Sequence, residues 1–161
     1  MTEVSGTLFI ERDKKNCVAD IIERIACLLK DGGNVLFFPE GTSGNGGALK
    51  PFKSSFFDAP LQARAPIMPI TINYKSINGH PVTRDNRDFI FWYGEMTFAD
   101  HFFRLLGRRS IDVDIRLHAP VELHDSADGG GLRKLACEST FEAVSGDFKL
   151  IGDGTQSAGF I

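Results

Sequence analysis

The sequence predicts an α/β domain whose mainly parallel, mixed sheet is flanked by helices. Apolar stretches of strand length alternate along the chain with segments whose apolar residues recur at helical spacing, and this order is typical of βαβ units. Two of the apolar stretches, at 34–39 and 65–74, are nearly continuous, as expected of strands that are covered on both faces. With 161 residues and an apolar content of 42%, the chain can bury the core of one domain.

The first strand, the first helix and the second strand follow one another closely. Residues 6–11, "GTLFIE", have the length and apolar content of a short buried strand. Apolar residues recur at helical spacing through 14–30 and predict a helix with one apolar face, which ends at the "DGG" of 31–33. The run "NVLFFP" at 34–39 predicts the second strand, and a glycine-rich loop follows it.

Turn-forming residues divide the middle of the chain. Pro60 limits the segment 55–64 to short helical turns, because proline breaks a longer helix. The stretch "APIMPITINY" at 65–74 predicts a third strand, and the Asn-Gly pair at 78–79 predicts a turn in the polar loop that follows. The run "FIFWYG" at 89–94 predicts a fourth strand.

Two helices and one strand complete the predicted domain. Residues 97–109 carry apolar side chains at helical spacing together with arginines, and such a helix either packs on the core or lies at an anionic membrane surface. The alternation in "SIDVDIRLHAPV" at 110–121 predicts a half-exposed strand, and 129–144 predicts a closing helix. We assign 1–151 to one domain and the small, polar residues 152–161 to a flexible tail.

The composition argues against several classes of function. A net charge of -3 indicates no general nucleic-acid binding. The three cysteines form no CxxC motif and no cluster with histidine, which argues against a metal site and favours a reducing compartment. The N-terminus lacks the pattern of a signal peptide, and no apolar run reaches the length of a membrane span. We therefore expect any membrane contact to be peripheral or to use a segment that this chain does not contain.

The most informative candidate site follows the second predicted strand, in the stretch "FFPEGTSGNGGALKPFK" at 37–53. Ligands of α/β sheets bind beyond the carboxyl ends of the strands, so Glu40 is expected to point into such a crevice. Glycines let a ligand approach the backbone, and successive loop amides can line an anion site. Lys50, Lys53 and Arg12 add positive charge. A carboxylate repels phosphate, so Glu40 is better suited to accept hydrogen bonds from ligand hydroxyls or to orient an arginine. The carboxylate, the glycines and the cations together indicate a ligand with both a phosphate and free hydroxyls.

Two nucleotide-binding motifs are not met by this loop. The P-loop needs a lysine where this chain has Gly47, and the dinucleotide-binding fingerprint needs a glycine where this chain has Leu49. A glycine loop that does no more than join a strand to a helix stays open as an alternative.

Three ordered stretches resemble the glycerol-phosphate and lysophospholipid acyltransferases. The segment at 37–53 is similar to the third conserved block of that family, F-P-E-G-T with P-F-K downstream. Before it, "GTLFIERD" at 6–13 is similar to the second block, a strand that ends in arginine, and after it "APIMPITI" at 65–72 is similar to the fourth. The stretch "FIFWYGEMTFADHFFRLLG" at 89–107 also resembles a bacterial branch that acylates lysophosphatidic acid or lyso-ornithine lipid.

This resemblance implies a fatty acyl transfer from acyl-CoA or acyl carrier protein to the free hydroxyl of a lysophospholipid, with no other cofactor and no metal. It also implies an acceptor site in which Arg12 binds the phosphate, and Glu40 and Gly41 shape the pocket. Thr42 would support the turn, and Lys53 would add a positive charge. Many members of the family have an arginine after E-G-T, where this chain has Ser43. Lys50 or Lys53 would then compensate, or the acceptor head group differs.

The family's chemistry depends on a histidine-x-x-x-x-aspartate block that precedes the second block. A lipid hydroxyl is a weak nucleophile, and a histidine oriented by an aspartate can accept its proton. His80 and Asp85 have this spacing, but they follow the fourth block in a polar loop, so we interpret the pair as a coincidence and assign no catalytic residue within the chain. We expect the catalytic pair upstream of Met1, which would make the chain the C-terminal part of the domain; a natural short homologue is the alternative.

Three functions stay open from the sequence. The first is an acyltransferase at the cytoplasmic face of a membrane, inactive as the isolated chain. The second is a non-catalytic module that keeps the lysophospholipid pocket. The third is a soluble α/β domain that binds another phosphorylated metabolite. Acyl transfer separates the first from the others, and lysophospholipid binding without turnover points to the second.

Overall fold

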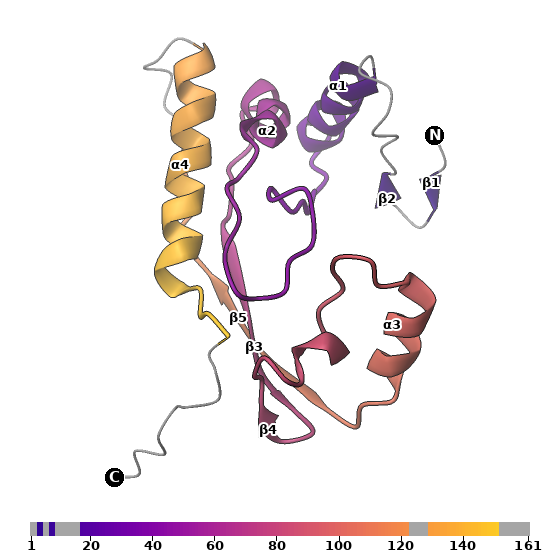
Figure 1. The fold of residues 1–161 in the computed structure, drawn as a ribbon. Helices are drawn as coiled ribbons and strands as arrows, with labels where there is room; N and C mark the ends of the chain where they lie inside the picture. The colour runs from indigo at the N-terminus through magenta and orange to yellow at the C-terminus, as the bar shows by residue number, and fades with distance from the viewer. Residues whose placement is uncertain (1–2, 5–6, 9–16, 123–128, 152–161) are drawn as a thin grey trace.

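The computed structural model describes residues 3–4, 7–8, 17–122 and 129–151 (Figure 1). The helices are α1 (Cys17–Lys30), α2 (Asp58–Ala63), α3 (Phe98–Leu106) and α4 (Gly129–Asp147), with short 3-10 turns η1 (Ser54–Phe57) and η2 (Arg87–Phe89). The strands are β1 (Glu3–Val4), β2 (Thr7–Leu8), β3 (Ile70–Ile77), β4 (His80–Pro81) and β5 (Ile111–Leu117). The three longer helices confirm the helical segments that the apolar spacing predicts. The proposed tail at 152–161 lies outside the described residues.

The main sheet has the strand order β4-β3-β5. Strand β3 pairs antiparallel with β5, from Ile70 opposite Leu117 to Ile77 opposite Ile111, with a bulge between Tyr74 and Ser76. A tight turn joins β3 to β4, and its residues 78 and 79 both have positive φ, 52° and 81°. That geometry suits Asn-Gly in a two-residue hairpin, so the predicted turn is confirmed.

The expected mixture of helices and sheet is confirmed, but a mainly parallel sheet is not. Every strand pair among the described residues is antiparallel, both in the main sheet and between β1 and β2. Apolar content shows that a strand is buried, whereas strand direction depends on which distant segment supplies its hydrogen bonds. The segment between β3 and β5 returns through α3, and this route brings β5 back in the opposite direction.

Two predicted strands are loops in the structure. The run at 34–39 forms no helix or strand and pairs with no strand that the structure describes. Its Phe37 packs on Phe56 and Phe57, with ring centroids 5.8 and 5.7 Å apart, whereas Leu36 and Phe38 are exposed. The run at 89–94 begins in η2 and continues as a loop in which Tyr93 donates a hydrogen bond back to Asp88. In each segment a phenylalanine packs, Phe37 in the first and Phe91 in the second, but the backbone has no partner strand among the described residues.

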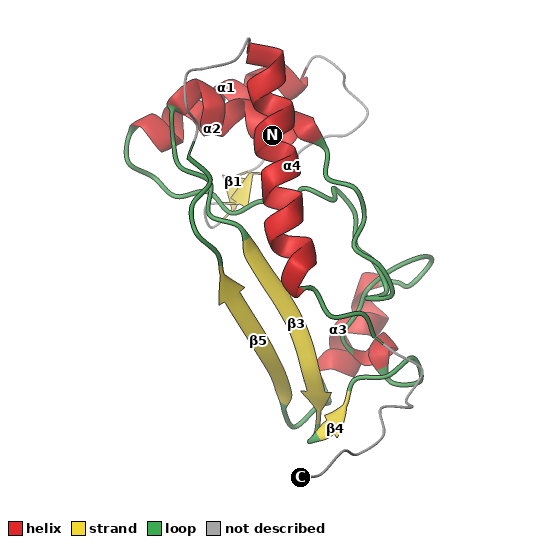
Figure 2. Cartoon of the chain, turned by 90° about the vertical axis from the view of Figure 1, so that its left-hand side faces the viewer, coloured by secondary structure: helices red, strands yellow, loops and turns green. Residues whose placement is uncertain are grey.

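The core lies between α4, η1 and the start of the sheet. Its buried side chains are Phe57, Ile67, Ala136 and Cys137, and the half-buried Phe37, Phe52, Phe56 and Val121 pack around them. Helix α4 runs beside β3, as Figures 1 and 2 both show. The residues of the sheet that face α4 are polar, whereas those of the opposite face are apolar and exposed: Ile72, Tyr74, Val113, Ile115 and Leu117.

Candidate functional site

The loop that follows Pro39 is closed at its base by two hydrogen bonds. The backbone amide of Lys50 donates to Glu40 Oε2 at 2.8 Å, and the backbone amide of Lys53 donates to the carbonyl of Pro39 at 2.9 Å. The half-buried carboxylate of Glu40 therefore spans ten residues and holds the two ends of the loop together. Its other oxygen, Oε1, makes no hydrogen bond with the part of the chain that the structure describes.

Both lysines fold onto this loop. Lys50 Nζ donates to the carbonyl of Ser43 at 2.8 Å. The Lys53 side chain lies against Gly41, where an added Cβ would meet Nζ at 2.9 Å and Cε at 3.0 Å. Gly41 also has a φ of 68°, so both its backbone and its neighbour require glycine. The structure thus brings the predicted residues Glu40, Gly41 and Lys53 together, and Thr42 lies exposed between them in sequence. Arg12 lies outside the described residues.

The tip of the loop is held by Ile151, which follows α4. The backbone amide of Ile151 donates to the carbonyl of Gly46 at 3.2 Å. A Cβ on Gly46, whose φ is 74°, would come within 2.3 Å of Ile151 Cδ1 and 2.8 Å of Phe91 Cζ. The glycine-rich loop is therefore packed against Ile151 and Phe91 at Gly46. The sequence does not predict this contact because it joins segments far apart in the chain.

Arg87 is a candidate binding residue that the sequence analysis missed. Its guanidinium Nη1 lies 3.8 Å from the position that a Cβ on Gly47 would occupy, which places this cation beside the loop. The guanidinium also lies over the Tyr93 ring at 5.6 Å, and its Nε is 3.9 Å from Asp88 Oδ1. The pKa of Tyr93 is raised, chiefly by the hydrogen bond it donates to Asp88 and then by burial. No spacing in the sequence pairs residue 87 with the loop.

His80 and Asp85 show no sign of acting together. His80 lies exposed in β4, opposite Ile77, and Asp85 lies exposed in the loop that follows. No hydrogen bond or ion pair between them is found in the described part of the chain. Their interpretation as a coincidence of spacing stays a prediction.

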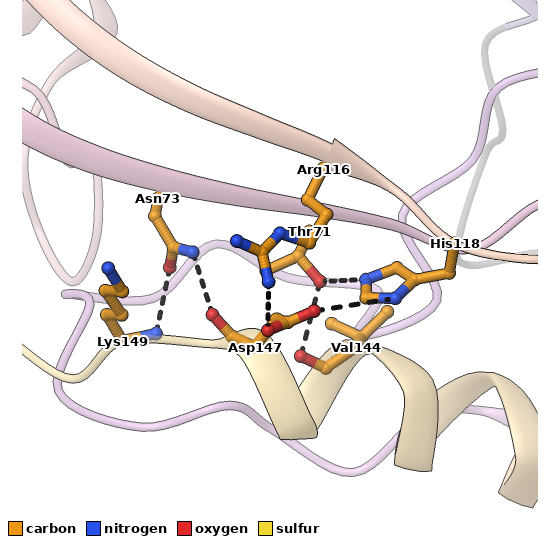
Figure 3. Close-up of polar contacts among 7 residues, drawn as sticks. All are labelled: Thr71, Asn73, Arg116, His118, Val144, Asp147 and Lys149. Atoms are coloured by element: carbon orange, nitrogen blue, oxygen red, sulfur yellow. Dashed lines mark hydrogen bonds and ion pairs between the residues drawn. The ribbon is translucent and has the colours of Figure 1, made fainter.

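A second polar cluster joins α4 to the sheet (Figure 3). Thr71 Oγ1 lies 2.8 Å from His118 Nε2, and His118 Nδ1 lies 3.7 Å from Asp147 Oδ2. Arg116 Nη1 donates to Asp147 Oδ1 at 2.5 Å, and this hydrogen bond is the main reason why the pKa of Arg116 is raised. Asn73 Nδ2 donates to the carbonyl of Asp147 at 2.9 Å.

This order of hydroxyl, imidazole and carboxylate is the one found in nucleophilic catalysis, but its position argues for a structural role. Thr71 is only 1% exposed, so a substrate has no access to its hydroxyl. The same hydroxyl donates to the carbonyl of Val144 at 3.3 Å. The cluster satisfies buried polar groups between β3, β5 and the end of α4, and so fixes the helix on the sheet.

Two kinds of feature are absent from the described residues. Among them, no group of three or more histidine, cysteine or acidic side chains is arranged to hold a metal ion. None of the described helices combines the length and the apolar content that crossing a bilayer requires.

Comparison with known proteins places these residues in a sequence context. A sequence model of the family Acyltransferase matches residues 1–73, which include the whole glycine-rich loop. The lyso-ornithine lipid O-acyltransferase of Rhodobacter capsulatus is 31% identical over 154 residues, covering 91% of this chain and 52% of the relative. The corresponding enzyme of Pseudomonas aeruginosa is 34% identical over 121 residues, covering 75% and 44%.

A second group of relatives carries a different name. The 1-acyl-sn-glycerol-3-phosphate acyltransferase of Neisseria gonorrhoeae is 24% identical over 147 residues, covering 91% of this chain and 55% of the relative. The chain spans about half the length of the curated relatives it matches. No solved structure matches the chain.

Proposed function

The chain belongs to the acyltransferase family, and from this premise we propose that the protein transfers a fatty acyl group from acyl-CoA or acyl carrier protein to the free hydroxyl of a lysophospholipid or lyso-ornithine lipid. The observation that carries the proposal is the closed loop at 40–53, which lies within the residues that the family model matches. That loop combines one carboxylate with two lysines, which suits a lipid acceptor that carries an anionic group and a free hydroxyl.

The acceptor head group is proposed to bind at this loop. Glu40 Oε1 is available to accept a hydrogen bond from a hydroxyl of the acceptor, while Oε2 holds the amide of Lys50. Lys53, together with Arg12, is proposed to face the anion of the head group. This anion is a phosphate in lysophosphatidic acid and, beside the ammonium of the side chain, a carboxylate in an ornithine lipid. Both anions are recognised by the same cations.

Arg87 is proposed to supply the charge that many family members place directly after E-G-T. This chain has Ser43 at that position, and Ser43 offers its carbonyl to Lys50. Lys50 is thereby held on the loop's own backbone, whereas Arg87 reaches the loop at Gly47 from another segment. An arginine from outside the motif would keep the positive charge that binds an anionic acceptor.

The acceptor hydroxyl attacks the thioester carbonyl: an O–C bond forms, the C–S bond breaks, and the thiol leaves with the proton. This step needs a general base, and no histidine precedes His80 in the chain. His101 is buried in α3 and His118 is bound to Thr71, so neither is offered to a substrate at the loop. We therefore propose that the isolated chain binds the acceptor without turning it over.

The cellular site proposed for this reaction is the cytoplasmic face of a membrane. Both proposed acyl donors are cytoplasmic compounds, whereas the acceptor resides in a bilayer. The described residues would contact the membrane surface without crossing the bilayer.

Acceptor binding in detergent micelles tests the proposal. We expect both lysophosphatidic acid and lyso-ornithine lipid to bind. Arg12→Ala should weaken the binding of lysophosphatidic acid by about 1.5–3 kcal/mol and should leave the binding of an uncharged monoacylglycerol nearly unchanged. Equal losses for both lipids would remove Arg12 from the head-group site. A chain that binds neither lysolipid, but binds a water-soluble phosphometabolite, would contradict the proposed acceptor class.

A further inference from the structure

The outer side of α3 is apolar and aromatic, and nothing in the described structure covers it. Phe98, Phe103 and Leu106 are 64%, 70% and 63% exposed. Their rings continue one another: the centroids of Trp92 and Phe98 are 5.9 Å apart, and those of Phe98 and Phe102 are 5.7 Å apart. We call this cluster the α3 aromatic face; its members are Trp92, Phe98, Phe102, Phe103 and Leu106.

The helix is held to the domain by its other side, so the exposure is not a sign of a detached segment. His101 is buried and Leu105 is half-buried on that inner side. Thr97 caps the helix by accepting a hydrogen bond from the amide of Asp100, and the Arg108 guanidinium lies 4.3 Å from the centroid of the Phe89 ring. A helix that only packed on the core would turn its largest apolar side chains inward, and this one turns them outward.

The charges around α3 are distributed unevenly along its axis. The acidic residue Glu95 precedes the helix, and Asp100 lies in its first turn. From residue 101 to residue 111 the chain has three arginines and no acidic residue, and Arg104 and Arg109 are exposed. The C-terminal end of α3 therefore combines exposed Phe103 and Leu106 with the exposed Arg109. Arg104 lines a hollow that it shares with the acidic side chains of Asp88, Glu95 and Asp100.

We infer that the α3 aromatic face docks on the surface of an anionic bilayer, with the C-terminal half of α3 deepest among the head groups. Apolar side chains of this size enter the boundary between head groups and acyl chains, arginines pair with anionic lipids, and Trp92 is of the type enriched at that boundary. The inference deepens the proposed function, on which the choice of a lipid partner rests, because it names the surface through which the protein reaches a bilayer that holds the acceptor.

Trp92 makes the inference directly measurable. It is the one tryptophan of the chain, it belongs to the α3 aromatic face, and its Nε1 donates to the carbonyl of Met96 at 2.7 Å. We expect its fluorescence to shift to shorter wavelength when the 161-residue chain is mixed with phosphatidylglycerol vesicles. We also expect quenching by lipids brominated near the top of the acyl chain. Phosphatidylcholine vesicles should give little of either effect.

Two double variants test the apolar and the charged parts of the face. Phe103→Ser/Leu106→Ser leaves the rings that touch Trp92 in place and should weaken vesicle binding by at least tenfold. Arg104→Gln/Arg109→Gln should weaken it by roughly fivefold for each arginine and remove the preference for anionic lipid. The matched controls are Leu135→Ser/Leu150→Ser, at side chains 56% and 65% exposed elsewhere, and Lys30→Gln/Lys134→Gln. Both controls should bind as the unaltered chain does.

Three results would overturn the inference. The first is equal binding to neutral and anionic vesicles. The second is loss of binding on Ile115→Lys, in the exposed face of the sheet, but not on Phe103→Ser/Leu106→Ser. The third is a Trp92 shift that follows protein concentration without vesicles, which would identify a second copy as the occupant. The vesicles contain neither lysolipid nor acyl donor, and acceptor binding is measured in micelles, so each proposal can fail without the other.

Discussion

Glu40 Oε2 accepts a 2.8 Å hydrogen bond from the backbone amide of Lys50, across ten residues of a loop that belongs to no helix or strand. The carboxylate of the family's third block thus also stabilises the closed conformation of the loop. Oε2 fixes the loop, whereas Oε1 makes no hydrogen bond within the described residues and is the oxygen that we propose for the acceptor. Substitution of Glu40 is therefore expected to change both stability and binding, but in different proportions.

Glu40→Gln and Glu40→Ala separate these two effects. Glutamine keeps an acceptor oxygen for the Lys50 amide, whereas alanine leaves that amide without its partner, so we expect the free energy of unfolding to fall by about 1.5–3 kcal/mol in Glu40→Ala and by clearly less in Glu40→Gln. Urea denaturation measures both, with the exposed Glu23→Gln on α1 as a control. If the two variants were equally stable, the hydrogen bond from Glu40 to the Lys50 amide would contribute nothing to the stability of the protein.

Gly46 should tolerate substitution less than another glycine with nearly the same backbone angle. Alanine at Gly79 adds only the strain of a φ of 81°, about 1–2 kcal/mol, because nothing lies within 4 Å of its Cβ. Alanine at Gly46 adds the overlap with Ile151 and Phe91, which costs about 1–3 kcal/mol more. Thermal unfolding of both variants gives the difference. Adding Ile151→Ala to Gly46→Ala should recover part of it, and no recovery would mean that Ile151 does not hold the loop.

The sequence predicts those parts of the molecule that depend on local pattern. The helix at 14–30, the Asn-Gly turn and the strand at 110–121 each follow from residues close together in the chain. The runs at 34–39 and 89–94 show the limit: a strand and an apolar loop that packs phenylalanines have the same composition, and the difference lies in whether another segment supplies hydrogen bonds. The antiparallel pairing of β3 with β5 is a long-range property of the same kind.

The candidate site divides in the same way. Glu40, Gly41 and Lys53 lie within one motif, and their proximity could be predicted from that motif. The contacts of Gly46 with Ile151 and of Gly47 with Arg87 join the loop to residues about 40 to 100 positions later. No residue type or spacing in the sequence predicts these contacts. Arg87 is therefore a candidate that only the folded chain reveals.

The role of Arg87 can be tested by moving its charge. Arg87→Gln should weaken binding of lysophosphatidic acid by about 1.5–3 kcal/mol, because a charge-assisted contact to the head group is lost, and should leave monoacylglycerol binding nearly unchanged. Ser43→Arg in the same chain should restore most of the loss by placing the cation where many family members have it. Lys134→Gln on α4 controls for net charge. A loss that Ser43→Arg does not restore, and that is equal for both lipids, would make Arg87 a packing residue of the loop.

The stability of the protein is expected to fall at alkaline pH in part through Cys137. Burial, and to a smaller extent Glu138, raise the pKa of its thiol. The unfolded chain then loses the proton more readily than the folded one, so this contribution to stability is complete below the ordinary cysteine pKa of about 8.5 and is lost as pH rises through the folded value. Unfolding free energies measured from pH 7 to 10 should fall less steeply in Cys137→Ala.

Thiol labelling gives an independent check of the same environment. In a Cys17→Ser background, the exposed Cys27 should react with a thiol reagent well before the buried Cys137, which also directs its Sγ at the carbonyl of Phe52. Two results would contradict this account. One is labelling of both thiols at the same rate, and the other is a fall in unfolding free energy from pH 7 to 10 that is identical with and without Cys137.

The 161-residue chain is expected to transfer no acyl group from acyl-CoA or acyl carrier protein to lysophosphatidic acid or lyso-ornithine lipid, although we propose that it binds the acceptor. A positioned general base typically contributes about 10²–10⁴-fold to such a reaction, and binding at the loop does not replace it. His80 has the family's spacing to Asp85, but both are exposed and the described structure shows no contact between them. Release of thiol from acyl-CoA is the measurement, with the full-length Rhodobacter capsulatus relative as the positive control. Turnover by this chain that disappears in His80→Ala, but persists in the control His124→Ala, would make His80 and Asp85 the working pair and the interpretation of their spacing wrong.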